Sequence, residues 1–438
     1  LKIADARRCP DLAPGRQSSV DREMVPPRDT QVDSSAALME SMMRVIRIGL
    51  PFQYFAGSMV MNARPLVAMM CAEQLGGQGA LAQARKGLAN ASALGSAGEL
   101  LLAPILGRLS DSAGRRPMVL LFALVPSLTR LAVCVTPSPH WRMRLLYVDL
   151  LLLRALGVMQ MNAAMQTMIS DAVPPSGQPE ARGSMMTFGA VGLVVGSAVG
   201  GQIAAGRWGP VGSYAVATCV GSLSWAYLCS QLPETRMPVA KTAAVNSTAA
   251  GSRKAGSSGL RRLLADPQIL CLASSLALQE AAELPQINET GAMFAREQLQ
   301  WSPRAIGRFV AGFGVAKLLG GAASGPLLKA LGSVSHVTMS NLALAVAYLC
   351  WGLARGTWGM VAVLPPLTLS AGKDLVLQTR VVERAAALGL GRGEAMGAVG
   401  AVRSVARILA PQIMVRLYNA ATLRHQGRSA PWMPPGSP

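Results

Sequence analysis

Five ionisable residues inside long apolar stretches are the side chains of this chain best placed to do chemistry. They are Glu99, Arg154, Glu280, Glu283 and Asp374. Ionisable groups within membrane-spanning segments usually mark ion or solute pathways. Glu280 and Glu283 are one helical turn apart, so each carboxylate raises the proton affinity of the other, which suits proton exchange. The alternative is that this segment ends in water, where both glutamates are solvated.

Other charged residues in apolar stretches have structural as well as functional interpretations. Arg130 is expected either to extend its guanidinium outward toward the membrane surface or to face the protein interior. Arg403 and Arg407 share a helix face at i, i+4 spacing, so they are expected to meet lipid headgroups or a pathway. The neighbours Lys373 and Asp374 project in different directions and are expected to serve separate partners.

A compact charged segment, GRLSDSAGRRPMVLL, lies between two apolar stretches from Gly107 to Leu121. Asp111 is placed to accept hydrogen bonds from free backbone N–H groups at a neighbouring helix N-terminus. Arg115 and Arg116 are placed to pair with Asp111 and to hold the turn at the membrane surface. The alternative is a plain basic loop of the kind that cytoplasmic faces of membrane proteins carry.

The composition argues against several classes of function. The chain is 51% hydrophobic and 14% charged with a net charge of +19, whereas soluble domains average about 25% charged residues. The cations lie between apolar runs and not among aromatic residues, so nucleic-acid binding is not expected. The scattered cysteines and histidines predict no metal site. No nucleophile–base pair or phosphate loop is apparent, so we expect neither an enzyme nor a cofactor.

Apolar runs long enough to cross a bilayer, about 20 residues, recur about eleven times. They are 45–71, 88–109, 117–136, 145–170, 184–205, 211–231, 268–294, 304–328, 335–354, 358–379 and 394–419. The run 268–294 is the weakest because four polar residues interrupt it and Pro285 is expected to kink it.

The polar segments between these runs divide the chain. Residues 1–43 lack an apolar signal segment and predict a disordered leader. A Ser-, Gly- and cation-rich stretch over 233–266 predicts a flexible linker. We therefore expect a six-helix bundle over 44–232, a second bundle over 267–420 and a polar tail over 421–438. The cation bias of the loops predicts that the N-terminus and the linker are cytoplasmic. The sequence does not identify which membrane the protein occupies.

The charged segment between the second and third runs resembles the loop signature of the major facilitator superfamily. The matching residues are Gly107, Leu109, Asp111, Gly114, Arg115 and Arg116. Arg154 is similar to the arginine of the family's span-four motif, although it precedes Gly157 by one residue fewer than usual.

The fifth run contains GLVVGSAVGG, which resembles the antiporter motif of that family with Ser197 where the family has proline. Small residues four apart predict a groove for a partner helix. The glycines concerned are Gly192, Gly196, Gly200 and Gly201.

The second half echoes the first, as expected for a family built from two related halves. GPLLKALG repeats the spacing of the loop signature with Gly325, Leu327 and Gly332, and Lys329 stands where Asp111 stood. The resemblance covers about 45–420 and implies an all-α membrane fold of two six-helix bundles. After Asn419 the chain becomes polar, so a twelfth helix has no sequence here. Truncation and an eleven-span form are both open.

The resemblance implies a multi-pass transporter whose two bundles rock around a central cavity and move a small organic solute through the lipid bilayer, with protons as the coupling ion. Our hypothesis is that Asp111 with Arg115 gates the cytoplasmic side, and that Arg154 with Glu280 or Glu283 lines the pathway. The tetracycline-efflux type of drug:proton antiporter is the closest subgroup. The alternative is a non-transporting relative, receptor-like or truncated. The substrate stays open.

Overall fold

The computed structural model describes residues 28–76, 78–156, 158–173, 178–235, 265–287, 290–297, 299–354, 356–388 and 392–426. Every regular element in these ranges is a helix. The first half contains α1 (Arg28–Leu75), α2 (Gln78–Ala113), α3 (Arg115–Val135), α4 (Pro139–Leu156), α5 (Val158–Ala172), α6 (Gln178–Ala204) and α7 (Gly209–Gln231). The second half contains α9 (Pro267–Ile287), α10 (Thr290–Glu297), α11 (Pro303–Leu353), α12 (Thr357–Val361), α13 (Leu364–Leu369), α14 (Lys373–Ala387) and α15 (Arg392–Gln426).

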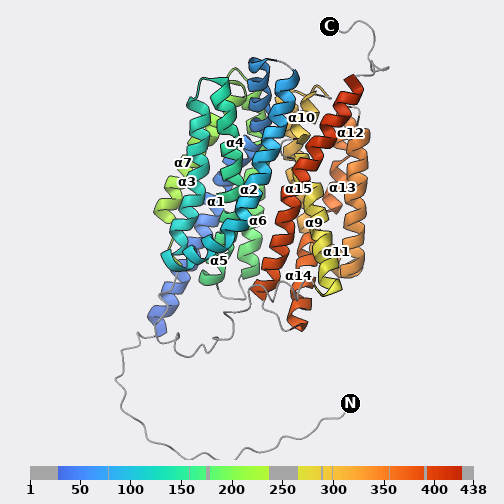
Figure 1. The fold of residues 1–438 in the computed structure, drawn as a ribbon. Coiled ribbons are helices and arrows are strands. Elements are labelled where there is room, and N and C mark those ends of the chain that lie inside the picture. The colour runs from blue at the N-terminus through green and yellow to red at the C-terminus, as the bar shows by residue number, and fades with distance from the viewer. Residues whose placement is uncertain are drawn as a thin grey trace, which may run out of the picture.

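The helices form two bundles that lie side by side, α1–α7 in one and α9–α15 in the other (Figure 1). The start of α1, the end of α7 and the start of α9 share one end of the molecule, called here the linker end (Figure 1). The last turns of α15 lie at the opposite end, called the far end. Most helices run between these two ends, as expected for segments that cross a bilayer.

Each bundle has its own apolar core, and a third cluster joins the two. In the first bundle the core near the linker end is rich in methionine, including Met165, Met168 and Met185, none of which is exposed. The joining cluster packs Leu66 and Ala204 of the first bundle against second-bundle residues that include Trp301. The two bundles therefore meet through apolar side chains as well as charged ones.

Large apolar side chains also cover the outside of the bundles. Leu223 on α7, Leu349 on α11 and Leu417 on α15 are more than half exposed. Such a surface is stable when its solvent is lipid. Within the described residues, three helical segments are long and apolar enough to cross a membrane: Arg115–Val135, Ala181–Ala204 and Pro303–Leu353.

Two glycines at matching places of the two halves share an unusual backbone. Gly114 precedes α3 with a φ of 102°, and Gly332 interrupts α11 with a φ of 74°. Glycine adopts positive φ without the steric cost that a Cβ brings. The repeat GPLLKALG therefore reproduces the backbone turn of the first half as well as its residue spacing.

Several boundaries differ from the expectation. α1 begins at Arg28 and not near residue 44, because the stretch SSAALMESMM supplies good helix formers. α15 continues to Gln426, beyond the expected end at 420. The expected run 358–379 is divided into α12, α13 and the start of α14, since Pro365, Pro366 and Gly372 interrupt a continuous helix. Residues 1–27 and 236–264, most of the expected leader and linker, lie outside the described ranges.

Candidate transport pathway

A network of charged side chains connects the two bundles. Arg407 on α15 donates through Nη1 to both oxygens of Glu99 on α2, at 2.9 and 3.1 Å. The Nε of Arg407 donates to Oε1 of Glu280 on α9 at 2.9 Å. All three side chains are at most 13% exposed. Buried charges of this kind persist only when they are paired, so the contact holds α2 against α9 and α15.

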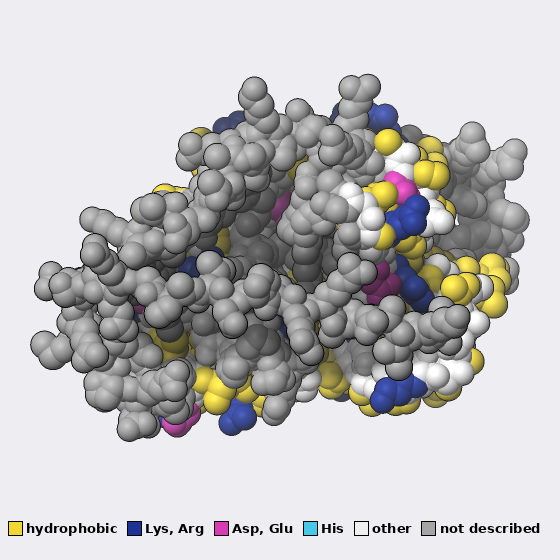
Figure 2. Space-filling view, turned by 90° about the horizontal axis from the view of Figure 1, so that it is seen from below, with side chains coloured by type: hydrophobic (Ala, Val, Ile, Leu, Met, Phe, Trp, Pro, Cys, Tyr) yellow, Lys and Arg dark blue, Asp and Glu magenta, His cyan; other side chains and the backbone are white. Residues whose placement is uncertain are grey.

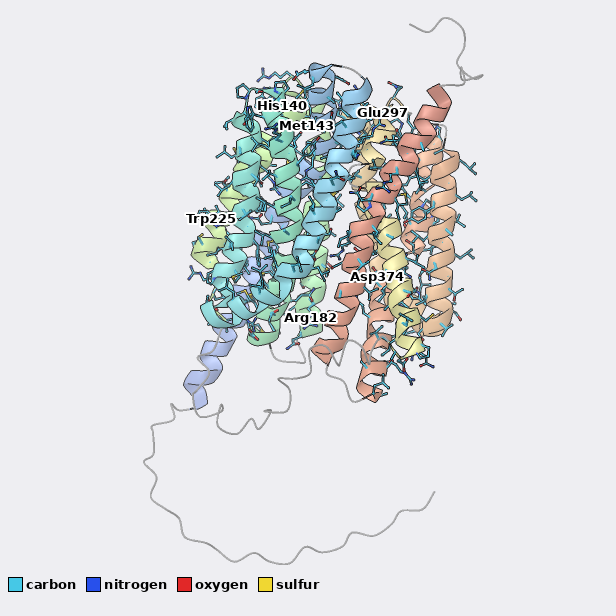
Figure 3. The ribbon with its side chains drawn as sticks, in the orientation of Figure 1. His140, Met143, Arg182, Trp225, Glu297 and Asp374 are labelled. Carbon is cyan, nitrogen blue, oxygen red and sulfur yellow. The ribbon has the colours of Figure 1, made fainter. Side chains whose placement is uncertain are left out.

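Arg403, one helical turn before Arg407, extends this network. Its Nε donates to Oε2 of Glu280 at 2.7 Å, and its Nη2 contacts the same oxygen. The Nη2 also lies 3.8 Å from Oδ2 of Asp374 on α14. Asp374 lies in the lower half of the second bundle in Figure 3. Glu280 therefore lies between two guanidinium groups.

Three of the five expected pathway residues, Glu99, Glu280 and Asp374, meet in this network. The sequence-based alternative that Arg403 and Arg407 contact only lipid headgroups is wrong, because both are paired with carboxylates. The expected pairing of Glu280 with Glu283 stays a prediction, since the Glu283 side chain lies outside the described residues. The sequence identified the acids and both arginines as charged residues within apolar stretches, but not which of them pair.

Arg154, the fourth described member, lies in the last turn of α4. Its stem packs on α2 at Gly95, where an added Cβ would lie 2.6 Å from the Cβ of Arg154. Glycine thus allows α2 to approach α4 closely at this level. Gly157, the partner glycine of the expected motif, is outside the described ranges.

A second charged cluster joins the bundles near the far end. Arg85 on α2 pairs with Glu297 on α10 at 2.6 Å and donates to Asn419 on α15 at 3.0 Å. Tyr418 donates its hydroxyl to Glu297 at 2.9 Å, and its ring lies 4.8 Å from the Arg85 guanidinium carbon. Glu297 is at the upper end in Figure 3. This cluster was not predicted from the sequence. The one feature that could have indicated it is Arg85, a charged residue within the largely apolar stretch ALAQARKGLAN.

The charged loop between α2 and α3 is organised around Glu234, a residue from the end of the first half. Its carboxylate accepts the backbone N–H groups of Arg115 and Arg116 at 3.1 and 3.3 Å. Glu234 is thus the anion at a helix N-terminus that the sequence led us to expect at Asp111. The side chain of Arg115 contacts Asp171, and that of Arg116 donates to the Cys229 carbonyl.

Glu234 also explains the position of Gly114, where a Cβ would lie 2.6 Å from Oε2 of Glu234. Leu109 lies in the last turns of α2 and is 44% exposed. The side chain of Asp111 and the surroundings of Gly107 are outside the described residues, so the gating role of Asp111 stays a prediction.

The four glycines of the fifth run lie at close helix contacts on α6. A Cβ at Gly192 would lie 2.3 Å from the Pro51 carbonyl oxygen of α1. Gly196 and Gly200 likewise face the α1 backbone, at Phe55 and Met59. Gly201 instead faces the second bundle, where a Cβ would lie 2.8 Å from the Cα of Gly307 on α11. One short stretch therefore contacts both the first bundle and the seam between bundles.

A fully buried ion pair lies inside the first bundle. Arg64 on α1 donates to Oδ2 of Asp149 on α4 at 2.9 Å, and both side chains are at most 2% exposed. Thr129 on α3 donates to Oδ1 of Asp149 at 2.6 Å. This pair was not predicted, although an aspartate within LLYVDLLLLR was a readable signal. Arg130, beside Thr129, is also 2% exposed. Of its two interpretations, the one in which it extends to the membrane surface is therefore wrong, and the one in which it faces the protein interior agrees with the structure.

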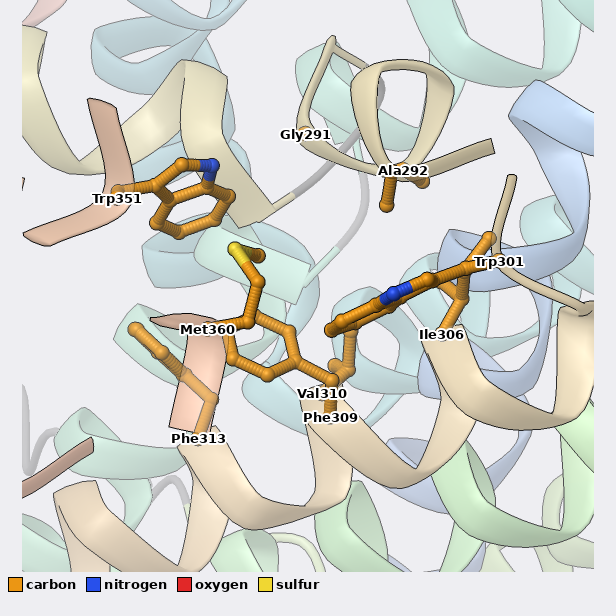
Figure 4. Close-up of a pocket in the computed structure, with 10 residues that line it drawn as sticks. Gly291, Ala292, Trp301, Ile306, Phe309, Val310, Phe313, Trp351 and Met360 are labelled. Carbon is orange, nitrogen blue, oxygen red and sulfur yellow. The ribbon is translucent and has the colours of Figure 1, made fainter. Parts of the chain in front are cut away.

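An apolar cavity at the far end of the second bundle is lined, among the described residues, by uncharged side chains alone (Figure 4). Trp301, Phe309 and Trp351 pack edge-to-face around it, with ring centroids 5.6 Å apart in each pair. Met360 of α12 closes it and is not exposed. Edge-to-face pairs of this kind add to the packing energy. We interpret the side chains around this cavity as an apolar core that holds α10 and α12 against α11.

Two helix bundles with an apolar exterior and paired charges between them define an all-α membrane protein. A sequence profile of the Major Facilitator Superfamily matches residues 50–411. The chain belongs to this family.

The chain is also similar to curated relatives and to solved structures. The chain is 24% identical over 328 residues to the class E tetracycline resistance protein of Escherichia coli, covering 74% of this chain and 76% of the relative. It is 23% identical to the class D protein of Salmonella ordonez, over 73% and 77% of the two chains.

Among solved structures, the fold is similar to a D-xylose-proton symporter with a TM-score of 0.60 and 17% identity, covering 85% of this chain and 89% of that one. It is also similar to the nucleoside transporter NupG, in a D323A mutant, with a TM-score of 0.62 and 13% identity, over 85% and 91% of the chains.

Proposed function

We propose that this protein is a secondary transporter that moves a small organic solute by alternating access, coupled to protons. The observation that carries the proposal is the contact of Arg407 with Glu99 and Glu280, which places two carboxylates between the bundles. Protonating either carboxylate removes one of the charges that hold Arg407. Proton binding would then weaken the contact between bundles, which is the coupling that such a transporter needs.

Contacts near the far end support a state whose bundles are closed on that side. Arg85 and Glu297 join α2 to α10, and Gly201 meets Gly307 between α6 and α11. A transporter of this kind must separate these residues when the far end opens. We propose that the Arg85–Glu297 pair is the far-end gate and that the Glu234-bound loop, with Asp111, is the gate at the linker end.

The sidedness is proposed from the sequence, in which the linker and the loops on its side carry more Lys and Arg than the loops on the other side. Figure 2 views the linker end, where Lys and Arg side chains lie among the described surface. Exposed arginines of α1 and α14, Arg44, Arg380 and Arg384, belong to this end. Cations favour the cytoplasmic face. We therefore propose that the linker end, with the N-terminus and the linker, is cytoplasmic.

Transport is tested with purified protein in vesicles under an imposed pH gradient. Tetracycline is the first probe, because the curated relatives are tetracycline resistance proteins. We expect saturable, gradient-dependent flux that is lost in Glu280→Gln and in Asp111→Asn, with membrane insertion intact. Glu383→Gln, in an exposed pair with Arg380, is the matched control and should transport normally. Absence of gradient-driven flux across a panel of organic solutes would favour the non-transporting alternative.

A further inference from the structure

Arg130 is a buried charge to which the described residues offer no direct partner. It lies on α3, and its Nε and Nη1 atoms make no hydrogen bond with any part of the chain that the structure describes. Arginine keeps its charge in proteins. An unpaired charge at 2% exposure is costly, so a compensating negative charge is expected close by.

The surrounding charges do not balance. The groups that act on Arg130 electrostatically are Arg64, Asp149 and Tyr214. Asp149 already pairs with Arg64 at 2.9 Å, and the phenol of Tyr214 is neutral. The sequences of α3 and α7 contain no aspartate or glutamate, and Asp149 is the single acid of α4. Two guanidiniums therefore share one carboxylate, which leaves one positive charge over.

Arg130 also lines a small cavity between α1, α3, α4 and α5. Its other lining residues are Gln53, Tyr54, Phe122, Pro126, Leu153 and Met161. Gly221 on α7 leaves space for the guanidinium, since a Cβ there would lie 3.6 Å from Nη1 of Arg130. The cavity has room for one small particle of about the size of a water molecule.

We propose that this cavity binds one small monovalent inorganic anion of the halide class, held by the guanidinium of Arg130. The anion supplies the missing negative charge within the first bundle. The volume excludes the carboxylate end of a larger organic solute. The site is therefore structural and does not depend on the proposed transport function.

The test is the thermal unfolding of the purified full chain in chloride and in gluconate at equal ionic strength. An anion that binds the native state raises the unfolding midpoint with its concentration. We expect the midpoint to rise by a few degrees in chloride and to saturate. Arg130→Gln should abolish this dependence. Arg144→Gln, the same substitution at an exposed residue of α4, should retain it.

A second measurement keeps the test decisive if Arg130→Gln does not fold. Crystals of the wild-type protein grown in bromide should show an anomalous peak beside Arg130. Equal midpoints of the wild type in chloride and gluconate would overturn the proposal. So would a chloride dependence that persists in Arg130→Gln, or bromide-grown crystals without a peak at this cavity.

Discussion

Arg407 of α15 donates to Glu280 of its own bundle and to Glu99 of the other bundle, each at 2.9 Å. One guanidinium thus bridges two carboxylates that lie on different halves of the molecule. Glu280 accepts from Arg403 as well, so it is the carboxylate on which both arginines depend. The contact between bundles at this level is therefore sensitive to the charge of a single residue.

Neutralising Glu280 should destabilise the protein strongly. Glu280→Gln leaves two largely buried guanidiniums short of a carboxylate, and breaking a buried pair costs about 3–5 kcal/mol. The measurement is the free energy of unfolding of the purified protein. Glu383→Gln removes an exposed pair and should change that free energy by less than about 1 kcal/mol. Similar losses for the two variants would show that the network carries no special weight.

The Arg64–Asp149 pair should be as critical to the first bundle. Asp149→Asn removes the single carboxylate shared by Arg64 and Arg130, so we expect a loss of about 3–5 kcal/mol in unfolding free energy. Glu40→Gln breaks the exposed i, i+4 pair with Arg44 on α1 and should cost less than about 0.5 kcal/mol. A mild effect of Asp149→Asn would mean that water or another group compensates the two arginines.

Adding a methyl group at Gly201 should separate the bundles near the far end. In Gly201→Ala the new Cβ meets the Gly307 Cα and the Pro303 carbonyl oxygen, each at 2.8 Å, and the backbone there must move. Such overpacking typically costs about 1–3 kcal/mol. Distances between spin labels on α6 and α11 should increase. Gly183→Ala, on the same helix with open space around it, is the control and should leave the distances unchanged.

Asp266 should stabilise the start of α9 in a pH-dependent manner. The backbone N–H of Ile269 and the guanidinium of Arg384 lower the pKa of this carboxyl below its ordinary 3.8. A lowered pKa means that the stabilisation is present above the unfolded-state value and is lost as the pH falls through the folded-state value. Asp266→Ala should therefore lower the midpoint of thermal unfolding slightly at neutral pH and progressively less in acid.

Asparagine separates the two contributions of Asp266. Asp266→Asn retains a side-chain oxygen for the N–H groups of Gln268 and Ile269 but loses the ion pair with Arg384. We expect it to recover most of the loss of Asp266→Ala, because Arg384 is 41% exposed and its ion pair is screened. Unfolding curves between about pH 3 and 7 would refute the cap if alanine and asparagine lowered stability equally.

Prediction from sequence succeeded where the signal is local. Apolar length located most of the long helices, and the glycines at 114 and 332 marked the turns, because positive φ depends on one residue and its neighbours. Prediction failed for charged residues whose position or partner could not be chosen from their sequence neighbours. The position of Arg130 was left open between the membrane surface and the protein interior, and Glu234 was not recognised as the anion at the start of α3. Both depend on helices distant in the sequence.

The sequence by itself determined that the chain is helical and apolar, since these properties follow from composition and run length, and its repeated spacing predicted two related halves. Only the tertiary structure decided which charges meet. Glu99 and Arg407 are 308 residues apart, and no local pattern relates them. Their pairing results from the way the two bundles pack, which depends on side-chain shape across the whole seam.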